Sequence, residues 1–252
     1  MKITILGCGT STGVPMVGCN CPICTSDDPR DKRTRASLLI CYNGRNVLID
    51  TSTDLRQQAL RHHIRRIDAV LFTHAHADHV NGIDDLRGFH FIHKEIIPCF
   101  ASQATLDTLR TGFSYIFDEH QHSGYIPLLA ANEIRNPFEL FDQVITPIPL
   151  LHGKTTSLGY RIGNIAYLTD CNAIPEQSLK LLQGVELLII DGLRWTEHPF
   201  HFNIPGAIAA ARQIGASRTI LTHLTHEIGY SDGKKLPSGV ELAYDGMEFD
   251  LQ

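Results

Sequence analysis

A dense cluster of metal-type donors constrains this chain more than any other stretch of its sequence. The segment Thr73–His79 reads Thr-His-Ala-His-Ala-Asp-His and directly follows the apolar run Ala69–Phe72. A strand that leads through a turn into a helix would point the three imidazoles and the carboxylate into one small volume. Imidazole and carboxylate suit divalent first-row metals, and the donors outnumber those that one tetrahedral ion needs. The segment therefore predicts a metal site, and the alternative is a polar surface turn that binds nothing.

Composition places the chain among ordinary globular proteins. Its 252 residues, with 43% hydrophobic and 19% charged residues, can form one large domain or two small ones. The formal net charge of −5 gives no broad basic field, so we expect no binding of long nucleic acid. Two short basic clusters, Arg30–Arg35 and Arg61–Arg66, are interpreted as solvated faces.

The start of the chain and its cysteines indicate the compartment. The run Ile3–Leu6 is too short for a secretory signal peptide or a membrane span. Three of the seven cysteines crowd together as Cys19, Cys21 and Cys24, which indicates metal binding in a reducing compartment rather than a disulfide framework. We therefore expect a cytoplasmic protein without a membrane segment.

The same three cysteines predict a second metal site. Two thiolates at Cys-x-x-Cys spacing can bind one zinc ion, and Cys19 is near enough in sequence to add a third ligand. A closed structural site requires a fourth donor from elsewhere in the chain. The alternative is three free thiols in a loop.

Further donors follow apolar, strand-like runs later in the chain. Because sites in layered α/β folds gather at the carboxyl ends of strands, we expect these donors near the histidine cluster. They are His152, Asp170 and His223. Asp50 also follows such a run, and it either caps a helix that ends at Leu60 or accepts a hydrogen bond from a metal-binding histidine.

Local patterns predict several other elements that bear on the site. Asn43-Gly44 favours a hairpin turn between two strands, and Asp78–Phe89 is expected to be one helix. A further helix is expected from Ser102 to Arg110, and another ends at Ile214 with Asn203 as its N-cap. Isolated histidines such as His120 and His122 are interpreted as surface or packing residues.

The pattern His-x-His-x-Asp-His resembles the metal-binding signature of the metallo-β-lactamase superfamily of hydrolases. Together with His152, Asp170 and His223, this pattern resembles the complete set of ligands that holds two metal ions in that superfamily. The resemblance implies a four-layer αββα sandwich, an α/β fold that forms one domain over residues 1–252. It also implies two divalent ions, zinc or manganese, with iron equally suited to N/O ligands. His74, His76 and His152 would hold the first ion and Asp78, His79 and His223 the second, with Asp170 bridging both and Asp50 supporting a ligand from outside.

Within the superfamily, the chain resembles the phosphoribosyl cyclic phosphodiesterase family of bacterial carbon–phosphorus lyase pathways. The resemblance rests on Gly18–Cys24, Leu48–Asp50, His223-x-x-His226, Leu236–Gly239 and Asp245–Glu248, and it is not found over residues 90 to 140. It implies a structural zinc in a small knuckle at residues 18–25, held by Cys19, Cys21, Cys24 and His226. It also implies that His201 approaches the phosphate and protonates the leaving alkoxide, and the alternative is a loop histidine with no role.

The expected activity is metal-dependent hydrolysis of a small cyclic phosphate, of the phosphoribosyl or cyclic nucleotide type. A hydroxide activated by two metals would attack phosphorus, with Asp78 in the catalytic centre as a ligand rather than a base. The partner is thus a small phosphorylated substrate, and the family suggests a homodimer. Alternatives are an RNA-processing nuclease, a hydrolase of other esters, thioesters or lactams, and a non-catalytic metal-binding carrier.

Overall fold

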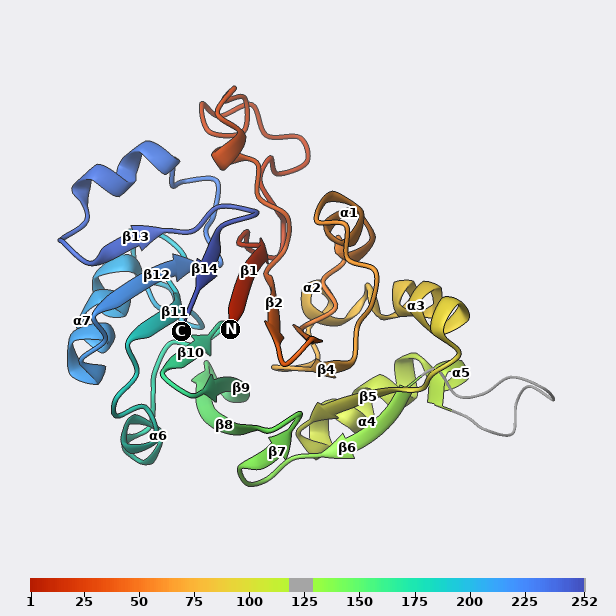
Figure 1. The fold of residues 1–252 in the computed structure, drawn as a ribbon. Helices are drawn as coiled ribbons and strands as arrows, with labels where there is room; N and C mark the ends of the chain where they lie inside the picture. The colour runs from red at the N-terminus through yellow and green to blue at the C-terminus, as the bar shows by residue number, and fades with distance from the viewer. Residues whose placement is uncertain (118–128, 252) are drawn as a thin grey trace.

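Two seven-stranded mixed sheets form the centre of the molecule (Figure 1). The structure, a computed structural model, describes residues 1–117 and 129–251, so the expectations for His120 and His122 lie outside the described residues. The first sheet has the order β14-β1-β2-β3-β4-β5-β6. Its strands are β1 (Lys2–Gly7), β2 (Ser37–Tyr42), β3 (Arg45–Ile49), β4 (Ala69–Leu71), β5 (Ile97–Ala101), β6 (Leu129–Glu133) and β14 (Glu248–Asp250).

The second sheet repeats this plan with the later part of the chain, in the order β13-β12-β11-β10-β9-β8-β7. Its strands are β7 (Phe138–Leu140), β8 (Gln143–His152), β9 (Thr155–Ile162), β10 (Ile165–Leu168), β11 (Leu187–Asp191), β12 (Arg218–Thr222) and β13 (Val240–Leu242). In each sheet a parallel half, β3 to β6 or β10 to β13, continues an antiparallel half. The parallel strands bring several carboxyl ends to one edge, as the sequence predicts.

Helices cover the outer faces of the two sheets. Helices α1 (Leu55–Arg61), α2 (Ala77–Val80), α3 (Leu86–His93), α4 (Gln103–Gly112) and α5 (Ser114–Phe117) follow strands of the first sheet, and α6 (Glu176–Leu181) and α7 (Ile204–Ile214) follow strands of the second. Figure 1 shows α6 and α7 on the opposite side of the molecule from α1 and α3. The short 3-10 helices are η1 (Pro29–Asp31), η2 (Ile83–Asp85) and η3 (Tyr230–Lys235).

Alternation along the strands creates the layers. Successive side chains of a strand point to opposite faces, so a strand that is apolar throughout contributes to two cores. In β3, Val47 and Ile49 pack in the core between the sheets, whereas Leu48 packs in the core under the helices of the first sheet. In β11, Ile189 joins the central core and Ile190 the core under α6 and α7. Three cores between four layers confirm the predicted αββα sandwich.

The prediction of one continuous helix over Asp78–Phe89 is wrong. The chain forms α2, then η2, then α3, and the break lies near Gly82. A Cβ atom at Gly82 would collide with the carbonyl oxygen of Ser52, so this glycine allows the chain to pass close to the segment after β3. By contrast, α7 begins after Asn203, whose side chain accepts a hydrogen bond from the Gly206 N–H, as predicted.

The two ends of the described chain meet beside β1. The amino group of Met1 donates to the carbonyl oxygen of Leu251 at 2.7 Å. Among the helices of residues 1–117 and 129–251, none has the length and apolar character needed to cross a lipid bilayer.

Candidate metal centre

The carboxyl ends of strands from both sheets deliver the predicted donors to one place. β4 leads into the histidine cluster, β8 ends at His152, and Asp170 and His223 follow β10 and β12. Asp50, Asp170 and His223 all have a left-handed backbone, with φ of 62°, 51° and 59°. This conformation is uncommon for residues other than glycine and is often found at functional sites. This conformation turns the backbone sharply at the end of each strand and directs the side chain of that residue toward the metal-type centre.

The donors form two adjacent groups, with all ligand atoms of each group within 4.8 Å of one another. We name the first donor group by its members, which are His74, His76, His152 and Asp170. In it, His74 Nε2 lies 2.9 Å from His76 Nδ1 and 3.8 Å from Asp170 Oδ1. The second donor group comprises Asp78, His79 and His223. The structure thus brings together all seven residues that the sequence singled out.

Asp170 lies between the two groups. Its Oδ2 is 3.0 Å from His79 Nε2 and 3.3 Å from His223 Nε2, while its other oxygen faces His74. His79 is fully buried, and the close contacts of its Nε2 with Asp170 and Asp78 do not have hydrogen-bond geometry, so this nitrogen has no hydrogen-bond partner in the described residues. A buried, unpartnered imidazole nitrogen facing carboxylates is the arrangement that a divalent cation would complete. The residues present therefore fit metal ions in both groups.

Electrostatics also favour positive charge between the carboxylates. Burial disfavours an imidazolium, yet the charges of Asp170 and Asp50 raise the pKa of His79 well above its usual value. Against the same effect of burial, Asp170 and Asp78 raise the pKa of His223 to about 9. Burial also opposes ionisation of Asp170, but His223 and His79 hold the pKa of this carboxyl well below its ordinary range. The carboxylates thus favour positive charge at His79 and His223, where a cation would also be stabilised, whereas burial lowers the pKa of His74 and His152.

Asp50 supports the second donor group. Its Oδ2 lies 2.7 Å from His79 Nδ1, and the N–H and hydroxyl of Thr73 donate to its two oxygens at 2.8 and 2.7 Å. The alternative that Asp50 caps a helix is wrong, because α1 begins at Leu55 with Asp54 as its N-cap. A carboxylate on Nδ1 fixes the ring so that Nε2 faces the centre.

His201 is adjacent to the centre and held by a buried carboxylate that sequence reasoning gave no role. His201 Nδ1 lies 2.6 Å from Asp191 Oδ2, and the ring stacks on His223 at 4.8 Å between centroids. Asp191 has no exposed surface and ends β11. The signal was present in the sequence, because Asp191 closes an apolar run much as Asp50 and Asp170 come after theirs.

A cavity of about 570 Å³ opens over both donor groups. Besides the site residues, its wall includes Ser11, Lys154, Thr155 and Phe200. Lys154 is exposed, and among the described residues it is the only lysine or arginine that lines this cavity. It lies in the turn between β8 and β9, two residues after His152, where no sequence pattern marked it.

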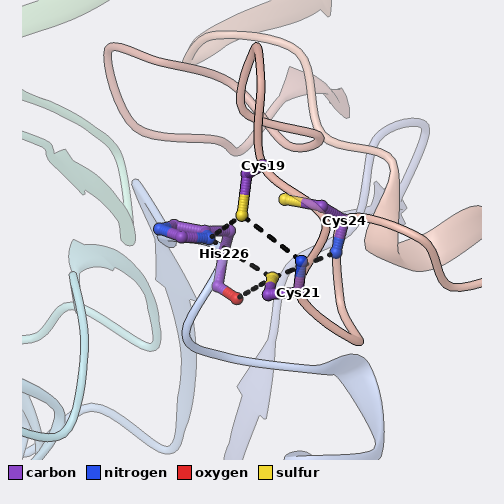
Figure 2. A group of neighbouring side chains, drawn as sticks. All are labelled: Cys19, Cys21, Cys24 and His226. Atoms are coloured by element: carbon purple, nitrogen blue, oxygen red, sulfur yellow. Dashed lines mark hydrogen bonds between the residues drawn. The ribbon is translucent and has the colours of Figure 1, made fainter.

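The predicted cysteine knuckle also forms, from two distant parts of the chain. Figure 2 shows the imidazole of His226 beside the sulfur atoms of the loop that carries Cys19, Cys21 and Cys24. His226 Nδ1 lies 3.3 Å from Cys19 Sγ and 3.4 Å from Cys21 Sγ. Donors around one tetrahedral zinc ion lie about 3.5 Å apart, so these spacings fit a single ion. None of the seven cysteines, all of which lie within the described residues, forms a disulfide.

The knuckle thiols differ in their ease of ionisation. The Cys24 N–H and the imidazole of His226 lower the pKa of Cys21 to about 6, so Cys21 is a thiolate near neutral pH. Burial raises the pKa of Cys24 to about 11, and the neighbouring sulfur atoms add to this effect. A divalent cation would remove that penalty and allow all three thiolates to form.

The sequence of this chain is similar to those of known proteins. Residues 45–224 match the family described as "Beta-lactamase superfamily domain". A protein of Porphyromonas gingivalis described as an octanoyltransferase is 43% identical over 254 residues, which cover 98% of this chain and 51% of that protein. The chain thus spans about half the length of this relative.

Solved structures resemble the chain along its whole length. A "new diphosphatase from the PhnP family" superposes with a TM-score of 0.93 and 38% identity, over 100% of this chain and 98% of the other. Zn²⁺-bound PqqB from Methylobacterium extorquens superposes with a TM-score of 0.83 and 21% identity, over 100% of both chains. The second likeness, at its low identity, concerns the fold alone.

Proposed function

The chain belongs to the metallo-β-lactamase superfamily, and on this premise we propose that it is a metal-dependent phosphodiesterase acting on a small cyclic phosphate. The observation that carries the proposal is the pair of adjacent donor groups, with Asp170 of the first group within 3.3 Å of His79 and His223 of the second, at the wall of one cavity. Two divalent ions held there would supply Lewis acidity toward phosphate oxygens and would lower the pKa of a water nucleophile. We further propose zinc in the cysteine knuckle, where thiolate and imidazole donors suit that ion.

The remaining steps belong to the protein's own residues. The buried Asp50 holds His79, and the carbonyl oxygen of Phe200, 2.8 Å from His152 Nδ1, holds His152. Each contact leaves Nε2 of the ring for the centre. These fixed orientations reduce the reorganisation that metal binding would otherwise require.

His201 is proposed as the general acid. Because Asp191 engages Nδ1, the other ring nitrogen, Nε2, remains for a substrate in the cavity that His201 lines. Its proton passes to the oxygen that leaves phosphorus as the P–O bond breaks, and Asp191 keeps the resulting neutral ring in place. Asp78 acts as a ligand in this scheme and not as a base.

The size and charge of the cavity favour a small anion over an RNA chain. A volume of about 570 Å³ is within the usual range for small-molecule sites. Lys154 gives the wall one positive charge, enough to attract a compact phosphate but not to follow a polynucleotide backbone. An RNA-processing nuclease is therefore the less favoured alternative.

A second candidate is hydrolysis of a diphosphate. It is favoured by the likeness to the PhnP-family diphosphatase, which extends over the whole chain at 38% identity. Attack at phosphorus and protonation of a leaving oxygen are common to both reactions, so the same residues serve either substrate.

A substrate panel tests both candidates. The purified protein is supplied in turn with zinc, manganese and iron, and is assayed on a cyclic mononucleotide, phosphoribosyl cyclic phosphate, a diphosphate diester, a structured RNA and a carboxylic ester. We expect the highest kcat/KM on a cyclic phosphate, and loss of turnover on chelation or in His152→Ala. Faster turnover of the diphosphate would replace the first candidate by the second. Bound metal without turnover on any substrate would indicate a carrier.

A further inference from the structure

Arg33 is a buried arginine that does not line the cavity over the donor groups. It touches neither the donor groups nor the cysteine knuckle through a metal-type donor, but it contacts the backbone that carries them. Arg33 is 2% exposed, and it is the largest of the fully buried side chains among the described residues. Its Nη1 donates to the carbonyl oxygens of Thr225 and Ile228 at 3.1 and 2.7 Å. Its Nη2 donates to Asp31 Oδ1 at 3.3 Å.

The two carbonyl groups belong to the loop that carries His226. Thr225 precedes His226 directly, and Ile228 follows two residues later, so the guanidinium spans the backbone on both sides of this histidine. Asp31 extends the contact, because its Oδ1 also accepts the N–H of Tyr230 at 2.7 Å. Arg33 thereby fixes the histidine side of the knuckle.

The backbone of Arg33 fixes the cysteine side. Val14 and Arg33 exchange two hydrogen bonds, with N–O distances of 2.9 and 2.7 Å. Val14 lies two residues before Met16, whose N–H donates to Cys24 Sγ at 3.3 Å. A single residue therefore connects the loop of the three thiols with the loop of their imidazole.

The same loop continues into the second donor group. His223 lies three residues before His226, and Leu224 between them is bound on both sides. The Leu224 N–H donates to the carbonyl oxygen of Cys8 at 2.8 Å, and its own carbonyl oxygen accepts the N–H of Thr10 at 3.2 Å. A shift of His226 would therefore be transmitted along a short, tethered segment to His223.

Energetics favour a positioning role over a purely stabilising one. Arg33 Nε has no hydrogen-bond partner in the described residues, and its one carboxylate contact is long at 3.3 Å. A buried, incompletely paired charge adds little stability relative to apolar side chains of similar size. The planar guanidinium instead holds the carbonyl groups of Thr225 and Ile228 in one fixed geometry.

We propose that Arg33 is a positioning residue that couples metal occupancy of the cysteine knuckle to metal affinity at the second donor group. Metal in the knuckle holds the loop of His226, and through Arg33 and Leu224 this loop holds His223. Coupling of this kind is reciprocal, so metal at the second donor group also strengthens binding in the knuckle. The proposal concerns metal affinity, and it can be tested whether or not the proposed substrate is correct.

A double-mutant cycle on the full chain with Co²⁺ as the probe tests the coupling. Cobalt bound to thiolates gives ultraviolet charge-transfer bands that nitrogen and oxygen ligands lack, so absorbance reports the knuckle and total cobalt reports all sites. The variants are Cys19→Ser, Arg33→Lys and the double variant, each titrated against a competing chelator. Cys19 is only half-buried, so its substitution spares the core.

We expect Cys19→Ser to weaken one active-site cobalt equivalent by about tenfold, the usual effect of a residue that orients a metal ligand, and to leave the other unchanged. Arg33→Lys is expected to weaken both that equivalent and the knuckle, and the double variant to weaken the active-site equivalent no further. Additive losses, or unchanged active-site affinity in Cys19→Ser, would overturn the proposal. If Arg33→Lys does not fold, the active-site cobalt affinity of Cys19→Ser decides the test by itself.

Arg30→Lys is the matched control. Arg30 lies in the same segment but is exposed and pairs with Asp28 at 2.8 Å. We expect it to retain wild-type cobalt affinities. If it weakened the same active-site equivalent as Arg33→Lys, the effect would belong to the segment in general and the assignment to Arg33 would be wrong.

Discussion

His201 and Asp191 form a pair in which a buried carboxylate engages one ring nitrogen of a half-buried imidazole, 2.6 Å apart. This is the arrangement by which acid–base histidines are commonly oriented, because it leaves the second nitrogen for the substrate. The resemblance in the sequence pointed to His201 but not to Asp191. The pair is what distinguishes a positioned acid from a histidine that merely lies nearby.

Replacing His201 separates these two interpretations. We expect His201→Gln to lower kcat by about 10²- to 10⁴-fold on a substrate with an alkoxide leaving group, because no proton donor remains. The loss is expected to be much smaller with a nitrophenolate leaving group, which departs without protonation. Steady-state kinetics on the two substrates, with metal content measured in parallel, provide the check. Equal losses on both would refute the acid role.

We propose that Lys154 contributes to substrate binding rather than to chemistry. Its ammonium group is exposed at the cavity wall, where it would meet the charge of an incoming phosphate. We expect Lys154→Met to raise KM about fivefold, equivalent to roughly 1 kcal/mol for an exposed charge pair, with kcat unchanged. The difference from wild type should shrink as salt is added. Lys180→Met, at an exposed position on α6, is the control and is expected to have no effect; a fall in kcat for Lys154→Met would contradict the binding role.

At the scale of elements, Asp68 connects the β2–β3 hairpin to the start of β4. Its side chain is 2% exposed and accepts hydrogen bonds from the Asn46 N–H at 2.8 Å, from Arg45 at 2.9 Å and from Arg66 at 2.6 Å. Burial alone would raise the pKa of Asp68, but these donors outweigh it and lower the pKa below the ordinary value. The carboxylate therefore stabilises the register that places β4, and with it the histidine cluster.

The pH dependence of stability checks this role. Because the pKa of Asp68 is lower in the folded chain than in the unfolded chain, its contribution is present above the ordinary carboxyl pKa and is lost as pH falls below it. We expect Asp68→Asn to reduce the free energy of unfolding by about 1–2 kcal/mol at neutral pH, measured by urea denaturation. The difference from wild type should narrow below about pH 4, and a difference that stays constant down to pH 3 would contradict the charge argument.

The whole molecule is divided into two sheets whose edges share the metal-type site. His74, Asp78 and His79 follow the first sheet, whereas His152, Asp170 and His223 belong to the second. Each donor group therefore contains residues from both sheets, and bound cations would connect the two halves. Without them, the site concentrates carboxylates and imidazoles that burial keeps away from water.

Metal removal is accordingly expected to destabilise the entire fold. An ion present at 100 times its Kd adds about 2.7 kcal/mol to the stability of the state that binds it. We expect the melting temperature to fall on chelation and to return on addition of metal, in a concentration-dependent way. Calorimetry with and without chelator measures this, and His152→Ala should show a smaller response. An unchanged melting temperature would argue against cations between the sheets.

The donor types of the metal-type centre could be predicted from the sequence, because residue identity and short-range spacing are local properties. The histidine cluster, the donors after later strands and the cysteine spacing were readable without coordinates, and so was the layered fold that strand patterns and family resemblance imply. The break in the helix predicted over Asp78–Phe89 could not be predicted, because it depends on the close approach of Gly82 to the backbone of Ser52, which is remote in sequence.

Apart from Asp50, the residues that support the donors could not be predicted from the sequence, because their contacts arise only in the folded chain. Asp191 faces His201, Lys154 borders the cavity, and Arg33 spans the carbonyl groups around His226, and none of these relations follows from spacing along the chain. Hydrogen-bond partners are set by how strand ends and loops converge, and that depends on the packing of two sheets rather than on any single segment. The histidine cluster therefore specified the metal-type centre, whereas the fold specified what holds each ligand in place.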